Sequence, residues 1–193
     1  SEDNLKFKEK AGKYIDFLNA NAYDKGRGVR TNIAGEFQKS NLAAALQTAE
    51  LICGRLDEDK IYEALSQIRI SGRMEEIAPG TIVDVSHNIQ GMQGFVQTVE
   101  ANYHGMKKRI LFAASHQNEE EYMKNILKTI PEIEAFYTVG IHKRRIDEAE
   151  FQDAFRKMID RNQETTVCFV VGSFYLAGMA KEFINQEEEN VRL

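Results

Sequence analysis

Polar side chains follow four short apolar segments of the chain, and these side chains are the best candidates for chemistry. They include three of the four histidines, and the four sets are Asp84, Ser86, His87 and Asn88; Ser115, His116 and Gln117; His142, Lys143, Arg144 and Arg145; and Gly172 and Ser173. Ligands bind beyond the carboxyl ends of the strands in open α/β sheets. We therefore expect a polar site that binds an anion or a carboxylate.

Two kinds of group in these sets suit such a ligand. His87 could orient a carboxylate or move a proton near neutral pH. Helices that begin at Asn88 and Ser173 would present free N–H groups and the positive end of a helix dipole.

The same residue types also have plain structural roles. Asn88 and Ser173 would cap helices in any such fold, and Asp84 could brace a loop. Spacing alone does not separate the two interpretations for Asp84 and His87, and it favours the structural one for Ser115 and His116.

Other kinds of active site receive little support. Zinc could be held by Asp84, His87, His116 and His142, but the chain has no tight ligand pair such as His-x-x-x-His, so we predict no metal site. Ser173 lacks a nucleophile-elbow pattern, and no Cys-His or Ser-His-Asp arrangement is recognisable, so no catalytic residue is assigned. The phosphate loop Gly-x-x-x-x-Gly-Lys-Ser/Thr does not occur.

The elements that would position these residues fall into two parts. Residues 1–70 are expected to be helical, because apolar residues recur at helical spacing. The two apolar stripes are Phe7, Ala11, Tyr14, Ile15 and Leu18, and then Leu42, Leu46, Ala49, Ile52 and Cys53. Asp57 is a candidate N-cap for a further helix.

Residues 71–193 show a different pattern. Residues 73–77 and 81–85 flank Pro79-Gly80 and predict a hairpin. After it, short apolar strands alternate with amphipathic helices, which predicts a mostly parallel sheet with helices on both faces. The fold expected is therefore α/β and Rossmann-like, preceded by a small helical segment.

Composition limits the function classes. The 193 residues suit one α/β domain with a short addition. The formal net charge of −5 argues against a nucleic-acid binder, and no apolar run is long enough for a membrane span. Cys53 and Cys168 are predicted to be buried thiols, and with the polar, charged start of the chain they favour a cytoplasmic protein.

Four segments together resemble one family, the folylpolyglutamate synthases, which are relatives of the Mur ligases. Residues 35–45 resemble Gly-x-x-Gln-x-x-Asn-x-x-x-Ala, and residues 71–75 resemble Pro-Gly-Arg-x-Glu. Residues 84–88 are similar to Asp-x-Ala-His-Asn-Pro, although Ser86 replaces the alanine and Ile89 the proline, and residues 172–176 are similar to a late Gly-Ser-x-Tyr segment. Their order and spacing make the resemblance specific.

The resemblance implies an ATP-dependent ligase that adds L-glutamate to folate, assisted by Mg²⁺. By resemblance, Asn41 would contact the adenine, Arg73 the phosphates and Asp84 the ribose. His87 and Ser173 would lie near the incoming glutamate. The family's P-loop domain, which holds the triphosphate and most of the Mg²⁺ contacts, is not in this sequence, so the chain alone is expected to be inactive. Residues 1–70 would be a remnant of the central domain.

The sequence also departs from the family pattern. Ser71 replaces the proline before Gly72-Arg73, and Gln117-Asn118 stand where the family usually has Lys-Asp. Two alternatives therefore stay open: a non-catalytic binding or regulatory module that retains the ligase fold, and a Mur-type cell-wall ligase domain.

Overall fold

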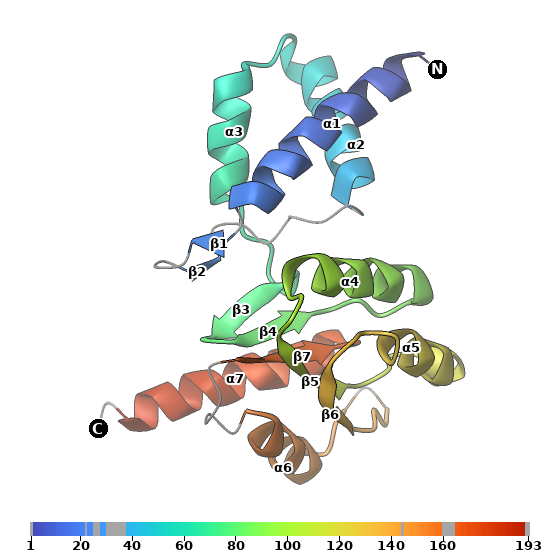
Figure 1. The fold of residues 1–193 in the computed structure, drawn as a ribbon, viewed down its shortest axis with the longest axis vertical. Helices are drawn as coiled ribbons and strands as arrows, with labels where there is room; N and C mark the ends of the chain where they lie inside the picture. The colour runs from blue at the N-terminus through green and yellow to red at the C-terminus, as the bar shows by residue number, and fades with distance from the viewer. Residues whose placement is uncertain are drawn as a thin grey trace. The chain divides into compact units, whose positions relative to one another are not determined.

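The computed structural model describes residues 2–21, 23–24, 28–29, 38–143, 145–159 and 165–191. It divides into two units, Ser1–Ser71 and Gly72–Leu193, which are described separately (Figure 1). Of the segments discussed above, residues 35–37 and Arg144 lie outside the described part.

In its described residues, the first unit consists of three helices and a short pair of strands. The helices are α1 (Glu2–Asn21), α2 (Gln38–Cys53) and α3 (Glu58–Gln67), and β1 (Tyr23–Asp24) pairs antiparallel with β2 (Gly28–Val29). The core consists of Phe7, Ala11, Tyr14, Ile15, Leu42, Ala43, Leu46 and Leu65. Asp57 caps α3, because its carboxylate accepts hydrogen bonds from the backbone N–H groups of Asp59 and Lys60.

The end of α2 differs from the prediction. Ile52 is 77% exposed, and Cys53 is exposed as well. Leu42 and Leu46 pack inward as expected, but the last turn of α2 finds no cover within the described part of this unit. The helical spacing was therefore right, and the assignment of Cys53 as a buried thiol was wrong. Cys168 is buried, as predicted.

The second unit contains a five-stranded sheet in the order β3-β4-β7-β5-β6. The strands are β3 (Glu75–Ala78), β4 (Thr81–Asp84), β5 (Lys107–Phe112), β6 (Ile133–Thr138) and β7 (Thr166–Val171). The predicted hairpin is confirmed as the antiparallel pair β3–β4, and the remaining neighbours are parallel. β7 is the last strand in sequence and lies at the centre of the sheet.

Helices cover both faces of this sheet (Figure 1). α4 (Ile89–Asn102) and α5 (Glu120–Leu127) lie on one face, and α6 (Glu148–Met158) and α7 (Phe174–Val191) on the other. Strand β7 shows why its apolar run is continuous: Phe169 and Val171 enter one core, and Cys168 and Val170 enter the other. The predicted fold class is confirmed. None of the described helices has the length and apolar character that a membrane span requires.

Candidate functional site

A tight loop at Gly72–Glu75 precedes the hairpin and carries Arg73. Gly72 has a φ of +71°, and a Cβ atom there would lie 2.8 Å from Cγ1 of Val85. Its N–H donates to Oε2 of Glu75 at 2.6 Å, and its carbonyl accepts from the N–H of Val85 at 2.8 Å. The glycine and the glutamate of this segment are therefore needed to fold the loop.

Asp84 braces the same loop from the end of β4. Its side chain is 2% exposed, and Oδ2 accepts from the N–H of Met74 at 3.0 Å. Oδ1 accepts from the N–H of Ser86 at 2.9 Å and from its hydroxyl at 2.6 Å. Burial raises the pKa of Asp84, and these hydrogen bonds together with the nearby charge of Arg73 oppose the rise. The carboxylate is occupied within the protein, so its contact with a ribose stays a prediction.

Arg73 lies between Gly72 and Met74, whose N–H groups are held by Glu75 and Asp84, and it is half-buried. In the part of the chain that the structure describes, no hydrogen bond or ion pair engages its guanidinium group. Arginine is permanently charged and presents a planar set of donors that matches phosphate oxygens. The loop therefore fixes the backbone on both sides of Arg73 and leaves its guanidinium group available to bind an anion.

His87 and Ser173 come from neighbouring strands, because Asp84 at the end of β4 pairs with Val171 at the end of β7. Nδ1 of His87 lies 3.0 Å from the carbonyl oxygen of Val85. A carbonyl oxygen can only accept, so the hydrogen bond places a hydrogen on Nδ1. The ring lies 5.4 Å from that of Phe174, centroid to centroid, so the starts of α4 and α7 meet here.

Ser173 caps α7. Its side chain is buried, and its hydroxyl oxygen accepts from the N–H of Tyr175 at 3.1 Å. Asn88 caps α4 in the same way, since its side-chain oxygen accepts from the N–H of Gly91 at 2.7 Å. The structural interpretation of both residues therefore holds, and a contact of Ser173 with glutamate stays a prediction.

The remaining polar loops contribute unequally to this edge. The hydroxyl of Ser115, in the segment that follows β5, donates to the carbonyl of Gly172 at 3.4 Å, whereas His116 and His142 are exposed. Among the described residues, no group of three or more His, Cys, Asp or Glu side chains could hold a metal ion.

Asn41 belongs to the first unit. It is exposed on α2, and its Nδ2 donates to Oε1 of Gln38 at 2.9 Å. Gln38 and Asn41, the two polar residues of the matched pattern, therefore bond to each other across one helical turn. The contact of Asn41 with adenine stays a prediction.

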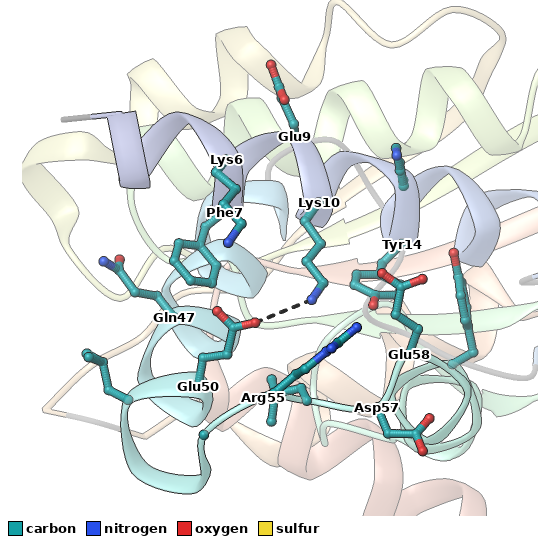
Figure 2. Close-up of a pocket in the computed structure, with 15 residues that line it drawn as sticks. Lys6, Phe7, Glu9, Lys10, Tyr14, Gln47, Glu50, Arg55, Asp57 and Glu58 are labelled. Carbon is teal, nitrogen blue, oxygen red and sulfur yellow. Dashed lines mark ion pairs between the residues drawn. The ribbon is translucent and has the colours of Figure 1, made fainter.

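The first unit also contains a groove that sequence reasoning missed (Figure 2). Its volume is about 1390 Å³, and its charged lining residues are Lys6, Lys10, Lys13, Arg55, Glu9, Glu50, Asp57 and Glu58. Lys10 pairs with Glu50 at 3.6 Å. The hydroxyl of Tyr14 is buried without a hydrogen-bond partner in the described structure, and burial is the main cause that raises its pKa to about 12. Balanced charges give this groove no preference for an anion or a cation.

Comparison with known proteins shows a similarity of fold but none of sequence family. No protein-family model matches the chain, and no curated protein matches its sequence. The fold, however, is the α/β fold found in part of the folylpolyglutamate synthase (FPGS) structures, as the four segments implied.

Three solved structures illustrate this likeness. An FPGS in complex with AMPPCP and folate has 20% sequence identity and a TM-score of 0.61, over 77% of this chain and 37% of that one. E. coli FolC in complex with DHPP and ADP has 16% identity and a TM-score of 0.60, over 78% and 39%. The Thermotoga maritima enzyme has 22% identity and a TM-score of 0.56, over 80% and 40%. The chain thus spans well under half of each.

Proposed function

We propose that this chain is the carboxy-terminal part of a cytoplasmic ATP-dependent ligase that adds L-glutamate to folate. The observation that carries the proposal is the Gly72–Glu75 loop, which presents Arg73 beside the carboxyl ends of the strands on a fold shared with FPGS structures. One of those structures holds AMPPCP and folate, and another holds ADP. The triphosphate would be held mainly by a P-loop domain outside this sequence.

In such a reaction ATP transfers its γ-phosphoryl group to a carboxylate of folate, which gives an acyl phosphate and ADP. The amino group of glutamate then attacks the acyl carbon, forms the amide bond and releases phosphate and a proton. The part proposed for Arg73 is to bind phosphate oxygens and offset their charge as it develops. His87 and the N-terminus of α7 at Ser173 are proposed to face the incoming glutamate, whose carboxylates suit helix N–H groups. Asp84 would act mainly by holding the backbone beside Arg73.

Mg²⁺ would neutralise phosphate charge in this reaction. Because the described residues bring no group of three suitable ligands together, we assign the ion to the expected P-loop domain and not to this chain.

Nucleotide binding by this chain tests the proposal directly. AMPPCP titrated into ¹⁵N-labelled protein should shift the amide signals of Gly72, Arg73 and Ser173, and Arg73→Gln should weaken binding about tenfold or more. The matched control is Arg156→Gln on α6, where the guanidinium lies over Phe183 and pairs with Glu187. Equal affinities for the two variants would reject the role of Arg73.

The full activity needs the native protein. Its intact mass in the source cells should be about twice that of this chain or more, and it should add glutamate to folate in the presence of ATP. Arg73→Ala in that protein should reduce turnover.

A non-catalytic module is the second candidate, and two observations favour it. The Asp84 carboxylate is already occupied, and the exposed Gln117 and Asn118 replace the charged pair of the family. A native mass equal to this chain, without turnover, would support this candidate. A panel of acceptor substrates would separate a folate ligase from a Mur-type ligase.

A further inference from the structure

We propose that Lys181 is a positioning residue for Arg73 and acts through Glu75. The inference rests on the proposed function for the importance of Arg73, but its geometry is independent. Nζ of Lys181, on α7, donates to Oε1 of Glu75 at 2.7 Å and to Oε2 at 3.0 Å. The same Oε2 accepts the N–H of Gly72 at 2.6 Å, so one carboxylate joins α7 to the residue before Arg73.

The loop needs this support because its backbone is unusual. Gly72 has a φ of +71° and Met74 a φ of +40°, and a left-handed conformation is costly for a residue with a side chain. Two carboxylates hold the loop, Glu75 at the N–H of Gly72 and Asp84 at the N–H of Met74. Arg73 is the residue between these two anchors.

Removal of the Lys181 charge weakens the first anchor. The Glu75 side chain is 26% exposed and that of Lys181 is 34% exposed, so the pair is partly shielded from solvent. Without the Lys181 charge, the cost of keeping the partly buried Glu75 carboxylate away from water is less well offset. A movement of this carboxylate toward water would take Oε2 away from the N–H of Gly72. The loop would then sample other conformations, and the backbone from which the Arg73 side chain extends would no longer be held in one position.

The same link ties two predicted parts of the site together. α7 begins directly after Ser173, and Lys181 lies roughly two turns further along this helix. The ion pair therefore links the helix that begins after Ser173 to the loop that carries Arg73. This arrangement would keep a phosphate contact and a glutamate contact in register.

The test uses three variants of the chain. Lys181→Met removes the charge, Lys181→Arg keeps it, and Lys157→Met is the control because it breaks an exposed ion pair with Asp153 on α6. Hydrogen exchange at the Gly72 amide, AMPPCP affinity and the Arg73 Nε–H signal are measured by NMR, with thermal midpoints for each variant. We expect Lys181→Met to raise exchange at Gly72 and to weaken AMPPCP binding, each about tenfold, with rescue by Lys181→Arg.

Unchanged exchange at Gly72 in Lys181→Met would overturn the proposal, and so would raised exchange with undiminished AMPPCP affinity. A loss of AMPPCP affinity that Lys181→Arg does not restore would also reject it. The same holds if Lys157→Met loses as much affinity for an equal drop in its thermal midpoint. If the unmodified chain fails to bind AMPPCP, the part proposed for this chain in phosphate binding fails instead. The positioning role is then decided by the Arg73 Nε–H signal, which must broaden or shift in Lys181→Met and recover in Lys181→Arg.

Discussion

At the scale of single residues, Asp84 shows how a buried carboxylate can organise a site without facing a ligand. Its two oxygens accept from the backbone of Met74 and from Ser86. A buried donor that loses its acceptor costs about 1–3 kcal/mol. The loop that carries Arg73 therefore depends on this side chain.

Asp84→Asn tests this dependence. The amide keeps one oxygen but turns an NH₂ group toward either Met74 or Ser86, so one N–H loses its acceptor, and we expect a loss of about 1–3 kcal/mol in urea unfolding. The control is Asp147→Asn, at the exposed N-cap of α6, where asparagine caps about as well as aspartate. Equal stabilities for the two variants would contradict the bracing role.

Lys108 is the second residue whose environment makes a prediction. It lies on β5, its side chain is fully buried, and its Nζ pairs with Oε2 of Glu132 at 2.9 Å. The hydrogen bond from Lys108 is the main cause that lowers the pKa of Glu132 below its ordinary value of 4.5. The two partners are not equivalent, because only Lys108 lacks access to water.

We expect Glu132→Gln to lower the free energy of unfolding, since it leaves a buried ammonium group without its carboxylate, and Lys108→Met to be neutral or stabilising. The pKa of Glu132 is lowered in the folded state, so its contribution is present above about 4.5 and is lost as the pH falls below that value. The deficit of Glu132→Gln should therefore shrink in acid. Urea titrations at neutral pH and near pH 3 measure it, and a deficit independent of pH would refute this account.

At the scale of elements, the junction of β7 and α7 is the most constrained point of the second unit. Gly172 has a φ of +107°, and a Cβ atom there would lie 2.5 Å from the carbonyl oxygen of Ala113 and 2.6 Å from the ring of Phe112. Both neighbours belong to the core of the sheet. This close approach brings the start of α7 to the end of β5.

Gly172→Ala should destabilise the protein by at least about 2 kcal/mol, because backbone strain and overpacking each cost about 1–3 kcal/mol. Gly178→Ala is the control within α7, where a Cβ atom would meet nothing within 4 Å, and it should gain about 0.5–1 kcal/mol from helix propensity. Chemical denaturation of both variants provides the measurement. A similar effect of the two substitutions would show that the junction has room to relax.

At the scale of the whole molecule, the chain consists of two units with separate cores. The second unit has apolar cores on both faces of its sheet and holds four of the five predicted site residues, Arg73, Asp84, His87 and Ser173. The first unit holds the fifth, Asn41.

Residues 72–193 should therefore fold on their own. We expect dispersed NMR signals and a single cooperative urea transition for this fragment, because its sheet is covered on both faces by its own helices. Collapsed signals, or a transition much broader than that of the full chain, would mean that residues 1–71 are needed for its stability.

Several features of this protein were determined by the sequence alone. The alternation of apolar strands and amphipathic helices, the hairpin at Pro79-Gly80, and the caps at Asp57 and Asn88 all follow from side chains within a few residues of one another. Local sterics and local hydrogen bonds decide such features, so they can be read along the chain. The resemblance to FPGS, which the fold comparison supports, rested on segments of the same local kind.

Only the tertiary structure decided which strand lies beside which and what each polar group touches. It placed β7 between β4 and β5, joined Lys181 to Glu75 across 106 residues of sequence, and turned Cys53 outward. It also showed that the Asp84 carboxylate accepts a hydrogen bond from the backbone N–H of Met74. These outcomes depend on how whole elements pack, and packing energy is shared among residues that are distant in sequence, so no local pattern records it.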